Sequence, residues 1–127
     1  MNWTSLLAVG GGAALGAWLR WGLGLWLNPL LPSLTLGTLA ANLIGGYLVG
    51  IAVAVFHINV ELPPELKLFA ITGFLGGLTT FSTFSAEVVT LIRSAQYGWA
   101  LGTASLHLFG SLLLTGLGIF TIQKLAQ

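Results

Sequence analysis

A polar run, Gly76-Gly77-Leu78-Thr79-Thr80-Phe81-Ser82-Thr83-Phe84-Ser85-Ala86-Glu87, lies in the middle of an otherwise apolar stretch. Adjacent glycines weaken a helix, and threonine and serine compete for its backbone hydrogen bonds. We therefore predict that the helix is broken near its middle, between Gly76 and Thr80. Backbone that is not helical at membrane depth needs protein or a cavity around it, and its freed carbonyl groups could bind a small cation. The alternative is a glycine kink that serves packing alone.

The two phenylalanines of this run, Phe81 and Phe84, are three residues apart and so share one face of a helix. A phenyl ring has a positive edge, against which an anion can lie. Ser82 and Ser85 lie on an adjoining face, from which their hydroxyl groups could donate hydrogen bonds. Phenylalanine pairs at this spacing usually just pack in a core, but the flanking hydroxyl groups and the glycine break favour anion binding here.

Three further polar residues stand within or near apolar stretches. Asn42 lies deep in one of them, where its amide must find a partner, either a neighbouring helix or an anion to which the NH₂ group donates. Glu87 follows Phe84 by about one helical turn and fits an anion pathway only if it is protonated, paired or at the rim. Arg20 could attract anions at a vestibule, or it could extend its side chain to the lipid headgroups.

Thr103, His107 and Ser111 recur every four residues and form a polar stripe on an apolar helix. The stripe either makes hydrogen bonds between helices or forms one wall of a wet pathway. His107 and His57 have no third ligand with them, so the sequence does not indicate a zinc site. The chain has no aspartate and no cysteine, which excludes a Ser-His-Asp triad and cysteine chemistry.

The elements that must position these residues are membrane helices. Hydrophobic residues make up 56% of the 127 residues and charged residues 6%, whereas soluble domains carry about 25% charged residues. We predict an all-α membrane protein, a single domain over residues 1–127, with transmembrane helices at about 4–27, 34–57, 65–93 and 97–123. Glycine pairs four residues apart, at 12 and 16, 46 and 50, and 98 and 102, would let these helices approach closely.

The cationic side chains are evenly divided between the two sides of the predicted membrane. Lys67 and Lys124 share the side of the termini, and Arg20 and Arg93 lie on the other. An imbalance of such residues normally fixes the orientation of a membrane protein. This balance indicates insertion in both orientations and an antiparallel, dual-topology dimer. The net charge of +1 and the lack of a basic run give no reason to expect nucleic acid as a partner.

Over nearly its full length the chain resembles the Fluc (CrcB) family of fluoride channels. The resemblance rests on the motif G-G-L-T-T-F-S-T-F-S at 76–85, on Gly-Ala-Trp-Leu-Arg at 16–20, on Asn42 in its apolar setting, and on Leu-His-Leu-Phe-Gly-Ser at 106–111. It implies an antiparallel homodimer in the bacterial inner membrane with two fluoride pores. It also implies passive fluoride export and a structural sodium ion at the dimer interface.

The resemblance also implies roles for individual residues. Sodium would be bound by the backbone carbonyls of Gly76 and Thr79; the vestibule assignment of Arg20 rests on its charge and position and not on the resemblance. The fluoride pathway would comprise Asn42, Phe81, Ser82, Thr83, Phe84, Glu87, Thr103, His107 and Ser111.

Three other functions are less well supported by the sequence. A small dual-topology multidrug-type exporter would need a carboxylate in its first helix, and this chain has none there. A scaffold protein would leave the broken helix and its hydroxyl groups unexplained. An enzyme is not expected, because no nucleophile and base are arranged together.

Overall fold

The computed structural model describes residues 2–32 and 34–127, which contain helices and no strand. Four helical segments are long and apolar enough to cross a membrane. They are α1 (Trp3–Leu27) with the 3-10 turn Asn28–Leu30, α2 (Leu36–Ile58), a composite third span from Pro64 to Arg93, and α6 (Tyr97–Leu125). The prediction of an all-α protein with four spans is confirmed.

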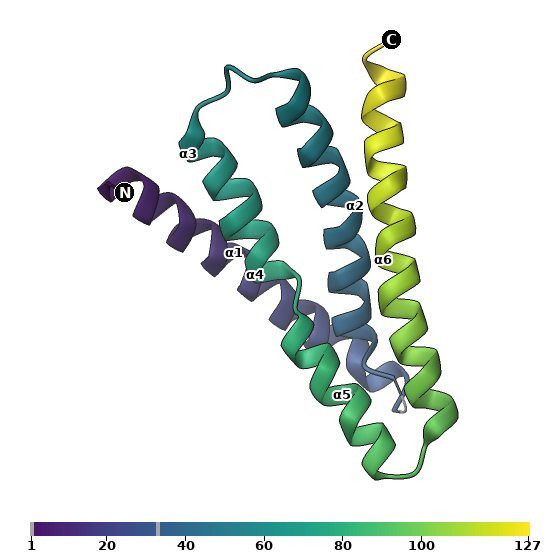
Figure 1. The fold of residues 1–127 in the computed structure, drawn as a ribbon. Coiled ribbons are helices and arrows are strands. Elements are labelled where there is room, and N and C mark those ends of the chain that lie inside the picture. Colours follow the sequence, from purple (N-terminus) through teal and green to yellow (C-terminus); the bar gives the residue numbers. More distant parts are fainter. Residues whose placement is uncertain (1, 33) are drawn as a thin grey trace.

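The third span consists of several helical pieces. It begins with α3 (Pro64–Lys67), continues as a π-helix over Leu68–Leu75, and ends its first half with α4 (Gly76–Leu78). After Thr79 and Thr80 it resumes as α5 (Phe81–Arg93). Figure 1 shows α5 continuing from α4 toward the end of the molecule where it turns into α6. The fixed φ of Pro64 and the negative charge of Glu65 suit the first turn of a helix.

Helices α2 and α6 pack side by side through small residues. A Cβ atom added to Gly46 would lie 3.0 Å from the carbonyl oxygen of Ser111, and one on Gly50 would overlap the backbone of Thr115. Such close approach lets the Thr115 hydroxyl donate to the Gly46 carbonyl, at 2.8 Å. The predicted packing role of the pair at 46 and 50 is confirmed.

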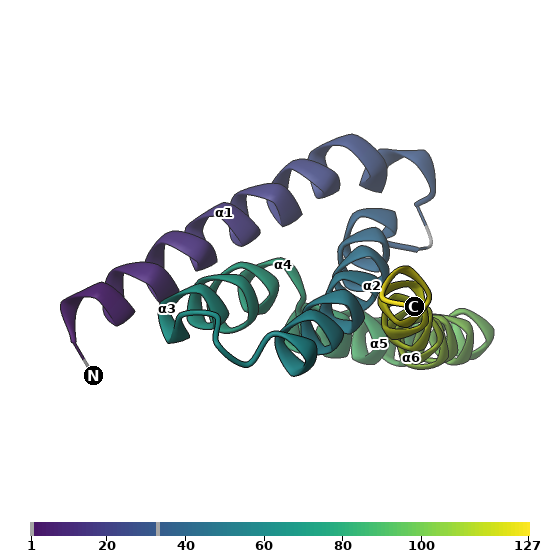
Figure 2. The same ribbon diagram turned by 90° about the horizontal axis from the view of Figure 1, so that it is seen from above.

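Helix α1 crosses the first half of the third span (Figure 2). Gly12 and Gly16 are buried there, and a Cβ on Gly73 would lie 2.7 Å from the Val9 carbonyl oxygen. The pair at 12 and 16 therefore also packs as predicted. Gly98 and Gly102 differ, because no atom of the described chain outside their own helix lies within 4 Å of an added Cβ.

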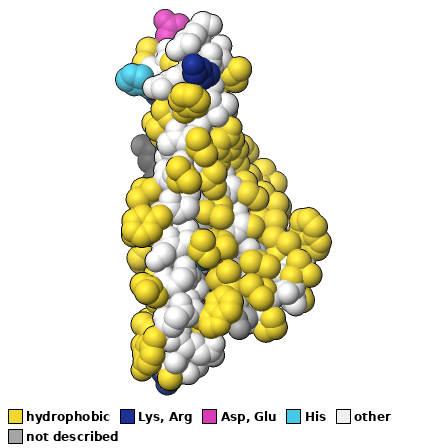
Figure 3. Space-filling view, turned by 90° about the vertical axis from the view of Figure 1, so that its right-hand side faces the viewer, with side chains coloured by type: hydrophobic (Ala, Val, Ile, Leu, Met, Phe, Trp, Pro, Cys, Tyr) yellow, Lys and Arg dark blue, Asp and Glu magenta, His cyan; other side chains and the backbone are white. Residues whose placement is uncertain are grey.

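Large apolar side chains cover much of the outside of the protein. Trp18, Phe109 and Leu113 are all more than 60% exposed, whereas the buried cluster centres on Ala41, Leu75 and Leu78. On the face drawn in Figure 3, hydrophobic side chains cover the middle and charged ones lie at the ends. Such a surface suits contact with lipid or with another apolar protein surface.

Candidate functional site

Two threonines separate α4 from α5. Thr79 (φ −85°, ψ 151°) and Thr80 (φ −148°, ψ 121°) are extended, so the helical conformation ends at Leu78 and resumes at Phe81, and the Thr79 N–H makes the last helical hydrogen bond, to the Leu75 carbonyl at 3.0 Å. The Thr79 hydroxyl donates to the Leu75 carbonyl at 2.8 Å. The Thr80 hydroxyl accepts from the Thr83 backbone N–H at 3.2 Å and so caps α5. These hydroxyl groups therefore satisfy backbone groups at the ends of the two helices.

Asn42 of α2 holds the backbone of Thr80 at both of its polar groups. The Thr80 N–H donates to Asn42 Oδ1 at 2.8 Å, and Asn42 Nδ2 donates to the Thr80 carbonyl at 3.1 Å. Nδ2 also lies 2.9 Å from Nδ1 of His107 on α6. Asn42 thus connects three segments of the chain, and both hydrogens of its amide have acceptors within the protein.

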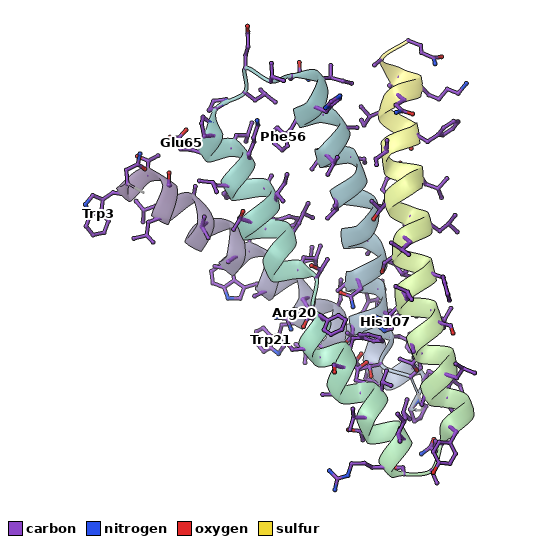
Figure 4. The ribbon with its side chains drawn as sticks, viewed as in Figure 1. Trp3, Arg20, Trp21, Phe56, Glu65 and His107 are labelled. Atoms are coloured by element: carbon purple, nitrogen blue, oxygen red, sulfur yellow. The ribbon has the colours of Figure 1, made fainter. Side chains whose placement is uncertain are left out.

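The carbonyl groups beside the interruption differ in whether they have partners. The Gly77 carbonyl accepts from Arg20 Nε at 3.1 Å, and the Thr80 carbonyl accepts from Asn42. Within residues 2–32 and 34–127, no hydrogen bond reaches the carbonyl of Gly76 or that of Thr79. These two oxygens are therefore free to coordinate a cation or to accept a hydrogen bond from another group. Arg20 lies against the backbone of α4, at the level where the third span is interrupted (Figure 4).

A cavity of about 320 Å³ collects many of the predicted residues. Its lining comes from α2, the interruption, α5 and α6: Asn42, Gly46, Thr79, Thr80, Phe81, Phe84, His107, Leu108, Ser111 and Leu112. The sequence analysis assigned no role in the site to four of these residues, Gly46, Thr80, Leu108 and Leu112, of which Thr80 has a polar side chain. Threonine is a common N-cap residue, whose hydroxyl accepts from the backbone N–H three residues later, here that of Thr83. This pattern could have identified Thr80.

A second cavity, of about 300 Å³, contains a different part of the predicted set. Thr83, Glu87 and Thr103 line it together with Thr35 and Thr90. In the described part of the chain, the carboxylate oxygens of Glu87 and the Thr103 hydroxyl are buried without a hydrogen-bond partner. Ser82, Arg20 and Gly76 line neither cavity, and Ser82 is exposed. The predicted residues therefore divide into one group at each cavity and a third group outside both.

The aromatic rings near the first cavity are in contact. Phe81 and Phe84 meet edge to face, with centroids 5.5 Å apart and an angle of 70° between the rings. Phe84 also stacks on the His107 imidazole at 4.6 Å and 29°. Phe81 remains 79% exposed, whereas His107 is only 4% exposed. The three rings that line the first cavity, those of Phe81, Phe84 and His107, are therefore in contact through Phe84.

Comparison with known proteins gives a consistent match along the chain. Residues 7–119 match the family described as "CrcB-like protein, Camphor Resistance (CrcB)". A protein of Nitrosospira multiformis named "Fluoride-specific ion channel FluC" is 64% identical over 127 residues, which are 100% of this chain and 99% of that protein. Proteins of the same name are 64% identical in Dechloromonas aromatica, over 93% of this chain and 87% of theirs, and 61% identical in Pseudomonas putida, over 92% of each chain.

Proposed function

This chain belongs to the CrcB-like protein family, and we propose that it is a fluoride-selective channel through which fluoride leaves the cytoplasm down its gradient. The observation that carries this proposal is the cavity that brings Asn42, Phe84, His107 and Ser111 together beside the interrupted span. The relatives named fluoride-specific ion channels cover nearly all of the chain.

The membrane location and the absence of enzymatic activity follow from the same comparison. The four apolar helices and the bacterial relatives confirm the prediction of a multi-pass bacterial membrane protein. The relatives' names describe ion channels, in agreement with the expectation that the chain is not an enzyme.

The residues at the first cavity suit a small anion that has lost its water. A strongly hydrated ion enters a narrow pathway only where donors replace its hydration shell. Its lining includes Ser111, whose hydroxyl can donate a hydrogen bond, His107, and Phe81 and Phe84, whose rings have positive edges. Asn42 would support this set, since its amide holds both the interruption and His107.

The second cavity would continue the pathway. Thr83, Thr103 and Glu87 line it, and the Thr103 hydroxyl is a donor without a partner in the described chain. Glu87 would suit an anion pathway when it is protonated. Ser82 and Arg20 would act outside both cavities, Ser82 at the exposed start of α5 and Arg20 beside the Gly77 carbonyl.

A second copy of the chain in the opposite orientation would complete the channel, with two pores in each dimer. Phe81 projects from the chain with 79% of its surface exposed, and Gly76 is exposed as well. Large apolar side chains face outward along the helices (Figure 3). The even division of Lys67 and Lys124 against Arg20 and Arg93 suits insertion in both orientations.

The carbonyls of Gly76 and Thr79 would hold a structural sodium ion at the interface of the dimer. Both oxygens lack a hydrogen bond within the described residues, and Gly76 is exposed where a second copy could meet it. Neutral carbonyl oxygens are suitable ligands for a hard monovalent cation. When bound, the ion would give these oxygens a partner and connect the two copies.

Efflux from liposomes tests the proposed function. Protein reconstituted into liposomes loaded with fluoride should release it rapidly when the membrane potential is clamped, as followed with a fluoride electrode. Liposomes loaded with chloride should retain their anion under the same conditions. A lack of fluoride release, or equal release of chloride, would contradict a fluoride-selective channel.

Replacement of Phe84 by isoleucine should slow fluoride efflux by about tenfold or more. Isoleucine keeps an apolar side chain at the cavity but removes the positive ring edge and the stack on His107. The same change at Phe81 should also slow efflux. The measurement is initial fluoride efflux per reconstituted protein.

Phe109→Ile is the matched control, because Phe109 of α6 lines neither cavity and is 64% exposed. Its efflux should match that of the unaltered protein. Unchanged efflux in Phe84→Ile, from protein that elutes normally in size-exclusion chromatography, would remove Phe84 from the pathway.

A further inference from the structure

Gly45 on α2 leaves the space that the side chain of Thr79 occupies. A Cβ atom added to Gly45 would overlap the Thr79 methyl carbon and lie 3.6 Å from the Thr79 Cβ. The next glycine, Gly46, differs, because a Cβ added there would lie 3.0 Å from the Ser111 carbonyl oxygen of α6. Gly46 therefore brings two helices together, whereas Gly45, which is buried, accepts one side chain of the interruption in the third span.

The Thr79 side chain cannot turn away from Gly45 without losing a hydrogen bond. Its hydroxyl donates to the Leu75 carbonyl at 2.8 Å, and the Thr79 N–H donates to the same oxygen at 3.0 Å. Because the Cβ atom of threonine carries both the hydroxyl and the methyl, the position of one determines the position of the other. Gly45→Ala would therefore either displace the Thr79 backbone or break the hydrogen bond from its hydroxyl.

The same helix also determines where the Thr79 carbonyl points. Asn42 lies one helical turn before Gly45, and its Oδ1 accepts from the Thr80 N–H at 2.8 Å. The Thr79 carbonyl belongs to the same peptide unit, which is trans, so it points away from the Asn42 oxygen. Asn42 fixes this unit at its N–H, and Gly45 fixes it through the Thr79 side chain. Two residues of α2 thus hold a carbonyl that no hydrogen bond in the described chain reaches.

We propose that Gly45 is a positioning residue for the sodium ion: by receiving the Thr79 methyl it holds the Thr79 carbonyl in the direction in which it coordinates the cation. This rests on the proposed function, in which that carbonyl is a sodium ligand. Gly45 acts through Thr79, since it has no side chain and lines neither of the two cavities. Ligands bind best when the surrounding structure holds them in place beforehand, so a small displacement of Thr79 should weaken sodium binding.

The sodium requirement of fluoride efflux tests this proposal in Gly45→Ala. The variant and the unaltered chain are purified and reconstituted in N-methylglucamine, and initial efflux is measured as sodium is added back. The sodium concentration that restores half of the maximal efflux should rise by about tenfold or more in Gly45→Ala, in the range that overpacking by one methyl group produces. An unchanged sodium requirement would overturn the proposal.

Thr79→Ser is the change that should reverse this effect. Serine keeps a hydroxyl that can donate to the Leu75 carbonyl but lacks the methyl that Gly45 receives. The double variant Gly45→Ala, Thr79→Ser should therefore need no more than about twofold more sodium than Thr79→Ser alone. Damage to the packing of α2 elsewhere would not be relieved by a change at Thr79, so a double variant as impaired as Gly45→Ala would contradict the proposal.

Gly11→Ala is the matched control for the added methyl group. Gly11 is an exposed residue of α1, and no atom of the described chain outside its own helix lies within 4 Å of an added Cβ. Its sodium requirement should equal that of the unaltered chain. If Gly45→Ala alone does not fold, recovery of folded protein in the double variant supports the contact with Thr79, and failure of the double variant to fold contradicts it.

Thermal unfolding in detergent, without fluoride, keeps this proposal apart from the proposed function. An ion that binds only the folded protein raises its melting temperature. At one sodium concentration this increase should be smaller for Gly45→Ala than for the unaltered chain, and the double variant should regain it. If the unaltered chain releases no fluoride from liposomes, the proposed function fails, and the melting temperatures still decide the role of Gly45. If the chain conducts fluoride but sodium stabilises Gly45→Ala equally, only the role of Gly45 fails.

Discussion

Fluoride efflux is expected to fall by about 100-fold or more when Asn42 is replaced by leucine. The change removes both hydrogen bonds to Thr80 and the one to His107. It leaves the Thr80 N–H and carbonyl without partners at membrane depth, where each such group costs about 1–3 kcal/mol. A loss of about 3 kcal/mol reduces the population of the interrupted conformation by about 100-fold. Initial efflux from liposomes measures the effect.

Asn59→Leu is the control for this substitution. Asn59 follows α2, is exposed, and donates only to the Val55 carbonyl of its own helix, at 3.1 Å. Efflux from Asn59→Leu should equal that of the unaltered protein. If Asn42→Leu folds and conducts at the normal rate, then the two hydrogen bonds between Asn42 and the Thr80 backbone are not needed for conduction.

Complete removal of sodium is expected to reduce fluoride efflux to the level of liposomes without protein. The carbonyls of Gly76 and Thr79 have no hydrogen bond in the described chain, so without a cation they would face each other unpaired in the proposed dimer. The experiment replaces sodium by N-methylglucamine throughout purification and reconstitution. Efflux should return when sodium is added back before the assay.

The return of fluoride efflux when sodium is added back distinguishes the loss of bound sodium from irreversible damage to the protein. Addition of the same concentration of N-methylglucamine salt serves as the control and should restore nothing. Full efflux from protein purified and reconstituted without sodium would contradict the need of these carbonyls for such an ion, and would leave the proposed fluoride pathway intact.

Much of the fold could be predicted from the sequence because a membrane restricts the choices. A chain with 6% charged residues cannot cover itself with polar groups, and in lipid each segment must satisfy its own backbone hydrogen bonds. Four apolar stretches separated by prolines and charges therefore indicate four helices. The glycine pairs at 12 and 16 and at 46 and 50 could also be identified, since small residues at this spacing allow close packing.

The types of the candidate site residues were visible in the sequence, but their partners were not. Asn42 required a partner at its depth, yet two kinds of partner remained open. The structure gives it the Thr80 backbone and His107, which are 38 and 65 residues away along the chain. Contacts of this range depend on how α2, α5 and α6 pack, and neither periodicity nor local spacing contains that information.

The sequence alone determined that this is a four-helix membrane protein with a run of hydroxyl and phenyl side chains in its third span. Composition and local pattern decide such features, because they act within single helices and their contact with lipid. Only the tertiary structure decided that Phe84 stacks on His107, that Glu87 and Thr103 share a second cavity, and that Arg20 meets the Gly77 carbonyl. The physical reason is that helix crossing angles and close glycine contacts determine which side chains meet.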